Sequence, residues 1–166
     1  MEHNPGFDTD AAHRWFGVEC NNAIFPLLAK PDRTPAETDE MIACAYSALL
    51  HWSRYSGATI VNIIRAENMI ATALCYAGRT QQALYHAQKN YDLLMANKAE
   101  AADFDFAYAL MAMARTHALA GNTHHAKEFY NQCADAIERI ADPDDKAIVA
   151  QDFAAGEWYG IAPQSH

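Results

Sequence analysis

Apolar residues recur along most of the chain at intervals of three and four positions, which is the period of an amphipathic α-helix. Stretches with this period begin near residues 9, 34, 59, 80, 103, 123 and 142. No stretch alternates convincingly between apolar and polar residues with the two-residue period of a strand. The pattern therefore predicts an all-α fold with about seven helices and no sheet.

Local signals mark several helix ends. Thr34, Pro35 and Glu37 combine an N-cap residue, a proline suited to the first turn and a capping-box glutamate. Asp142 followed by Pro143 predicts the start of the last helix in the same way. Pro26 falls inside the first periodic stretch, so we expect it to kink that helix or to start a new short turn.

One heptapeptide occurs twice, as AGRTQQA at residues 77–83 and as AGNTHHA at residues 120–126, and its glycines are 43 positions apart. Each copy lies between two amphipathic stretches. A glycine just past one helix and a threonine at the start of the next are typical of a tight corner between helices. The two copies predict two helix hairpins of similar geometry.

These corners resemble those of tetratricopeptide repeats. Gly78 with Ala83 and Gly121 with Ala126 have the family's glycine-to-alanine spacing, and Ala71 and Ala114 match its small residue seven positions before the glycine. The family's large aromatic residue near the start of the first helix is absent, and the spacing exceeds the usual ~34 residues. The chain also resembles short bacterial proteins of this type, a likeness that implies a fold but no reaction.

The resemblance implies one domain built as a right-handed array of antiparallel helix hairpins. We expect helix pairs over residues 9–57, 58–97 and 103–141, with a terminal capping helix over 143–159. Such pairs cannot cover their own apolar faces, so neighbours stack around a shared core.

Net charge, the length of apolar runs and the distribution of cysteines indicate which partners and which cellular location to expect. The chain of 166 residues has a formal charge of −9 and no basic cluster, which argues against nucleic acid as a partner. It has no apolar run long enough for a membrane span and no signal peptide at its start. The four cysteines are scattered without a Cys-x-x-Cys pair, so we expect reduced thiols and a cytoplasmic protein.

Two polar residues interrupt the predicted buried faces when the repeats are superposed. Glu67 falls where the other copy has Leu110, and His117 falls where it has Leu74. A buried carboxylate requires a cation, because its desolvation otherwise costs several kcal/mol. The candidate cation sources are Arg14, His51, Arg65 and Arg115. We expect a buried polar cluster of Glu67, His51 and His117, either a structural salt bridge or a ligand-binding or catalytic site.

The resemblance also implies a concave groove lined by the first helices of successive pairs. The residues that would face it are Asn62, Arg65, Asn68, Thr72, Asp105, Tyr108, Met111 and Arg115. Two arginines with amides and a tyrosine suit a peptide carboxylate or an acidic side chain. In the alternative interpretation this is a solvated polar face whose arginines pair with Asp103 or Asp105.

Sequence motifs for chemistry are absent. The histidines show no chelating spacing, and neither a nucleophile elbow nor a glycine-rich phosphate loop occurs, so we expect no metal and no cofactor. The first hypothesis is a non-enzymatic interaction module that holds a peptide or protein segment in its groove. The second is a small-molecule-binding or catalytic protein that uses Glu67, Arg65, His51 and Arg115. The third is a structural homodimer.

Overall fold

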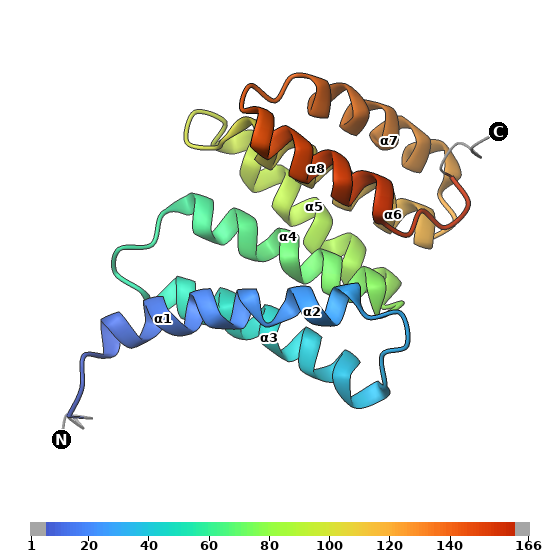
Figure 1. The fold of residues 1–166 in the computed structure, drawn as a ribbon. Coiled ribbons are helices and arrows are strands. Elements are labelled where there is room, and N and C mark those ends of the chain that lie inside the picture. The colour runs from blue at the N-terminus through green and yellow to red at the C-terminus, as the bar shows by residue number, and fades with distance from the viewer. Residues whose placement is uncertain (1–5, 162–166) are drawn as a thin grey trace.

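The structure is a computed structural model that describes residues 6–161, and all regular secondary structure in this range is helical. Eight helices follow one another along the described chain (Figure 1). They are α1 (Thr9–Asn22), α2 (Ile24–Ala29), α3 (Pro35–Arg54), α4 (Ile60–Tyr76), α5 (Thr80–Ala96), α6 (Asp103–Leu119), α7 (Thr123–Glu138) and α8 (Pro143–Ala155). The predicted all-α class is confirmed.

The expected break near Pro26 explains why eight segments replace the predicted seven. The first helix is interrupted at Ala23, so that Pro26 becomes the third residue of the short helix α2. A proline there needs no backbone donor, because the first N–H groups of a helix have no partner within it. The helix therefore restarts ahead of the proline instead of running through it.

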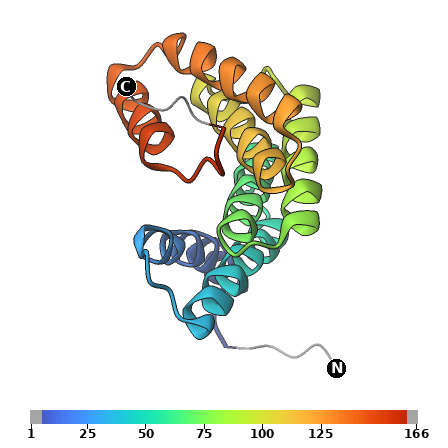
Figure 2. The ribbon, with the colours of Figure 1, turned by 90° about the vertical axis from the view of Figure 1, so that its right-hand side faces the viewer.

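Successive helices lie against one another as antiparallel neighbours. Helix α4 packs against α3 and α5, and α6 packs against α5 and α7. Contacts also join α4 to α6 and α6 to α8, so the first helices of successive pairs form a continuous inner layer. The array is curved, and its two ends, α1–α2 and α8, lie on the same side (Figure 2). Within residues 6–161, no helix combines the length and the apolar content needed to cross a bilayer.

The two repeated corners have the same backbone geometry. Gly78 has φ +69° and Gly121 has φ +75°, values that glycine adopts without a steric penalty. In each corner the following N–H returns to the helix, from Arg79 to the carbonyl of Leu74 and from Asn122 to that of His117, both at 2.9 Å. This is the glycine-terminated helix end that the heptapeptide predicts. The threonines are the first residues of α5 and α7, whereas Arg79 and Asn122 hold the N-cap positions.

The predicted caps at Thr34 and Asp142 are confirmed. The Thr34 N–H donates to Oε2 of Glu37 at 2.8 Å, while the Glu37 N–H donates to the Thr34 hydroxyl at 3.3 Å. A carboxylate oxygen of Asp142 accepts from the N–H groups of Asp144 and Asp145. These contacts fix where α3 and α8 begin. The start of α8 matters for the fold because α8 packs against α6 at the C-terminal end of the inner layer.

Replacement of a corner glycine tests this geometry. Gly121→Ala introduces a Cβ into a left-handed backbone conformation, so we expect a loss of about 1 kcal/mol in the free energy of unfolding. Space is not the reason, since a Cβ at this position would meet nothing within 4 Å. Gly121→Asn should cost less, because asparagine tolerates this conformation better. Equal stability of wild type and Gly121→Ala in urea unfolding would contradict the assignment.

Candidate functional site

A groove of about 420 Å³ lies on the concave side of the array. Residues of α4 and α6 form its floor, and residues of α2 and α8 form its two walls. These walls belong to the two ends that approach the same side of the molecule in Figure 2. The apolar lining includes Phe25 and Leu28 from α2 and Met69 and Met111 from the floor. The groove is therefore a mostly apolar site with a few polar groups, as ligand sites generally are.

Five of the eight residues that the sequence placed in the groove line it, and they are Asn68, Thr72, Tyr108, Met111 and Arg115. The other three, Asn62, Arg65 and Asp105, are not among the residues that line it. Asn62 instead caps α4, where its side-chain oxygen accepts from the Thr59 N–H at 2.9 Å.

Arg65 and Asp105 form a forked ion pair. Nε and Nη2 of Arg65 donate to the two carboxylate oxygens of Asp105 at 2.8 and 3.0 Å. Asp105 also accepts from the Ala102 N–H, which caps the start of α6. Arg65 therefore pairs with an aspartate of the same protein, as the alternative interpretation of a solvated polar face expected. Of the two arginines assigned to the groove, Arg115 is the one that lines it.

Tyr108 and Asp152 join the groove floor to the α8 wall. The Tyr108 hydroxyl donates to Oδ2 of Asp152 at 2.6 Å. Burial, together with the neighbouring Asp152 carboxylate, raises the pKa of Tyr108 well above its usual value. Tyr108 therefore stays a neutral donor and cannot act as a phenolate base near neutral pH.

Arg115 lies at the α8 end of the groove, and only 7% of its surface is exposed. Its Nη2 donates to the backbone carbonyl of Asp152 at 2.7 Å, and its guanidinium carbon lies 4.7 Å from the centre of the Trp158 ring. Gly156 packs directly against it, because a Cβ there would lie 1.5 Å from Nη2. Among the described residues, no carboxylate lies within ion-pair distance of Arg115, and its Nε is enclosed without a hydrogen-bond partner.

Glu67 is completely buried, as its place in the repeat predicts, but its partners are not the predicted ones. One carboxylate oxygen contacts Nδ1 of His86 at 2.6 Å, and the other contacts Nζ of Lys89 at 2.6 Å. The Tyr46 hydroxyl lies 3.0 Å from the remaining ring nitrogen of His86. Glu67 is thus enclosed between helices and is absent from the groove lining.

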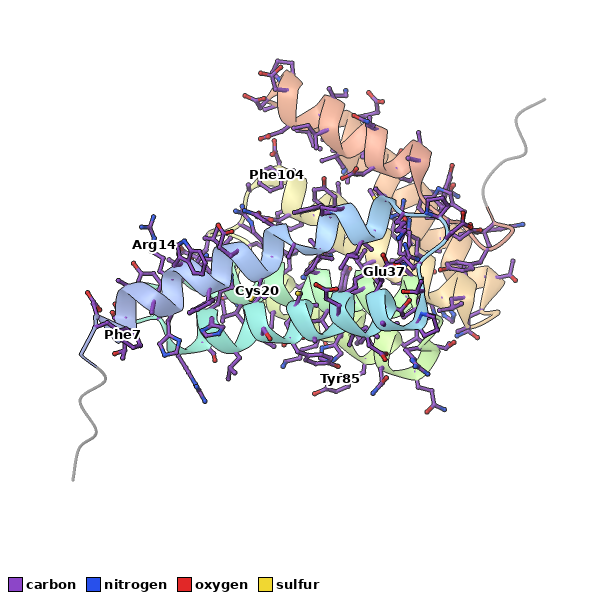
Figure 3. The ribbon with its side chains drawn as sticks, turned by 60° about the horizontal axis from the view of Figure 1, so that its bottom comes forward. Phe7, Arg14, Cys20, Glu37, Tyr85 and Phe104 are labelled. Atoms are coloured by element: carbon purple, nitrogen blue, oxygen red, sulfur yellow. The ribbon has the colours of Figure 1, made fainter. Side chains whose placement is uncertain are left out.

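The four candidate cations for Glu67 were wrong. Arg14 projects from the exposed side of α1 (Figure 3), and Arg65 is paired with Asp105. Arg115 contacts α8, and His51 contacts α1. The sequence signal that could have found the true partners is the i, i+3 spacing of His86 and Lys89 on α5, which places both on one helix face. Lys89 was overlooked because its ammonium group reaches inward from a half-exposed position.

The expected cluster of Glu67, His51 and His117 does not form. His51 on α3 contacts His13 on α1, with their Nδ1 atoms 2.8 Å apart. The His117 ring stacks on Phe129 of α7 with a centroid separation of 5.6 Å. Burial lowers the pKa of both His51 and His117. The three residues therefore lie at three different interfaces, with His51 against α1, His117 against α7 and Glu67 against α5.

In the part of the chain that the structure describes, no group of three or more His, Cys, Asp or Glu residues is arranged to hold a metal ion. Comparison of the chain with protein-family models, curated proteins and solved structures finds no match. The likeness to tetratricopeptide repeats therefore stays a resemblance of corners and helix pairs. The function has to be inferred from the groove itself.

The Glu67 pairing predicts a stability effect. Glu67→Gln leaves Lys89 and His86 without their buried anion, so we expect the free energy of unfolding to fall by about 2 kcal/mol. Glu138→Gln is the matched control, because Glu138 pairs with Lys146 on the exposed surface. That control should leave stability almost unchanged. If urea unfolding finds the two variants equally stable, the buried pair does not stabilise the fold.

The His51 environment predicts a dependence on pH. Since the folded state lowers the pKa of His51, the unfolded chain binds its proton more readily, and stability falls as the pH drops below the ordinary value of 6.5. Urea unfolding of wild type and His51→Gln at about pH 7.5 and about pH 5.5 measures this term. We expect the variant to lose less stability on acidification. An unchanged loss would show that His51 titrates equally in both states.

Proposed function

We propose that this chain is a non-enzymatic binding module, similar to tetratricopeptide-repeat proteins, that holds a peptide or protein segment in its concave groove. The observation that carries the proposal is Arg115, a buried cation without a carboxylate partner in the described chain, at one end of an apolar groove. A protein with more acidic than basic side chains has many anions available to pair with an arginine. An arginine left unpaired beside a groove suggests that its anion comes from a bound molecule.

The shape of the groove supports an extended occupant. It runs across two floor helices, from the α2 wall to the α8 wall, and each wall contributes residues of a different character. Phe25 and Leu28 of α2 offer apolar surface at one side, whereas Asp152 of α8 offers polar atoms at the other, next to Arg115 of the floor. A segment of chain can satisfy both sides at once, with an apolar side chain and an acidic group in sequence.

The catalytic hypothesis has less support than groove binding, because the residues that it requires are dispersed over different helix interfaces. Glu67 is enclosed with His86 and Lys89, Arg65 is paired with Asp105, and His51 belongs to the α1–α3 interface. Of that set only Arg115 lines the groove. A general acid or base would have to lie within hydrogen-bond reach of a substrate, and none of the other three meets the groove.

A groove-filling substitution tests the proposal. Thr72 lines the groove, is partly exposed, and makes no hydrogen bond through its side chain among the described residues, so Thr72→Trp fills the space without removing a structural contact. We expect a random-peptide display library to yield a family of peptides that bind the wild-type protein and lose binding to this variant.

The matched control is Gln82→Trp, which adds the same side chain at an exposed position of α5 outside the groove. It should bind the selected peptides as the wild type does, and thermal unfolding checks that both variants fold. Selection of no peptides, or of peptides that bind all three proteins equally, would contradict groove binding.

A further inference from the structure

The charge of Arg115 is incompletely balanced within the described chain. A guanidinium has five N–H donors, and the only hydrogen bond that this one makes there runs from Nη2 to the Asp152 carbonyl. Within residues 6–161, Nε is enclosed and unpaired, while Nη1 also lacks a hydrogen-bond partner but is not enclosed. Nη1 is therefore the donor that a molecule in the groove can meet. A buried charge of this kind is stabilised by an anion that hydrogen-bonds to it.

The guanidinium is also held in one position. The Trp158 ring lies against it, Gly156 covers it without a side chain, and the end of α8 anchors Nη2. Asp152 is one of the last four residues of α8, whose carbonyls have no partner within the helix. The hydrogen bond to the end of α8 therefore uses one N–H donor of Arg115 and fixes the position of its side chain. It leaves the positive charge available at the groove surface.

The surroundings discriminate between kinds of anion. The Asp152 carboxylate lies at the same end of the groove, where it accepts from Tyr108, and it adds negative charge to the site. One arginine balances only one negative charge, so a dianionic phosphate would bring a second, unbalanced charge into a mostly apolar groove. A carboxylate carries a single charge and accepts a charge-assisted hydrogen bond from a donor such as Nη1. The floor beside Arg115 is apolar, with Met111 and Ala112.

We propose that the Arg115 end of the groove is a subsite for a single carboxylate group carried on an apolar body. Arg115 holds the carboxylate through Nη1, and the apolar floor takes the adjoining hydrophobic part. The inference rests on groove binding as proposed above and names the chemistry recognised there. That carboxylate can be the end of a peptide chain or an acidic side chain within one.

The test uses the wild-type protein, labelled with ¹⁵N, and follows the Arg115 guanidinium signals by NMR. Four probes are titrated: N-acetylleucine for a chain end, N-acetylglutamic acid α-amide for a side chain, and N-acetylleucinamide and inorganic phosphate for comparison. We expect saturable shifts with at least one carboxylate probe and binding about tenfold weaker or more for the neutral amide and for phosphate. The tighter of the two carboxylate probes identifies the source. No saturable shift with either carboxylate, or equal binding of the amide or phosphate, would overturn the subsite.

A variant supplies the second measurement. Arg115→Lys keeps the charge but removes Nη1 and the planar group that Trp158 and the Asp152 carbonyl hold in place, so carboxylate binding should weaken about tenfold. Arg54→Lys is the control, because Arg54 is exposed at the end of α3 and lies outside the groove lining. If Arg115→Lys does not fold, the wild-type titration decides alone.

The two proposals fail separately. Display-selected peptides that need an open groove at Thr72 but bind Arg115→Lys normally would keep groove binding and overturn the carboxylate subsite. Carboxylate probes that shift Arg115 in a protein that selects no peptides would keep the subsite and overturn peptide binding.

Discussion

Helix α6 is the element on which the rest of the structure depends, because it packs against α4, α5, α7 and α8. A helix with neighbours on most sides needs small or apolar residues around most of its circumference. Alanines at 107, 109, 112, 114 and 118 meet this need and let the neighbouring helices approach closely. The polar residues that α6 retains must then find partners within the packed array, since water does not reach them. Asp105 and Thr116 do so through Arg65 and the α6 backbone.

Two buried charges on neighbouring helices have different surroundings. Glu67 on α4 is enclosed by α5 and meets two basic side chains, so its charge is balanced inside the protein. Arg115 on α6 meets a carbonyl, a tryptophan face and a glycine, which hold its position without supplying a countercharge. A balanced buried pair most often reflects structure, whereas a positioned charge beside a groove that has no ion-pair partner in the described chain is a candidate for ligand binding. This contrast makes Arg115, and not Glu67, the centre of the candidate site.

Helix α8 completes both the fold and the groove. It begins at the Asp142 cap, crosses α6, and ends where the Asp152 carbonyl accepts from Arg115. The following turn then brings Gly156 and Trp158 against the same guanidinium. A terminal helix that only screened the core would need apolar contacts alone. Here the same segment also forms one wall of the groove and fixes its arginine, so the contacts that complete the fold also shape the groove at this end.

Sequence alone determined what depends on local periodicity and local chemistry. The helical class, the two glycine corners, the caps at Thr34 and Asp142, the break near Pro26 and the burial of Glu67 all follow from spacings within a few residues or from comparison of the two copies. The resemblance to tetratricopeptide repeats, rather than any local pattern, implied a groove, and five of the eight residues that it assigned there line the groove of the structure.

The tertiary structure alone decided which side chains meet across helices. Arg65 and Arg115 both lie on the helix rows that the resemblance to tetratricopeptide repeats assigns to one groove, yet one meets Asp105 and the other meets α8. His51, His117 and Glu67 lie on three different interfaces. A sequence period fixes the face of a helix but neither its rotation nor its axial position against a neighbour, and those two quantities set every long-range contact.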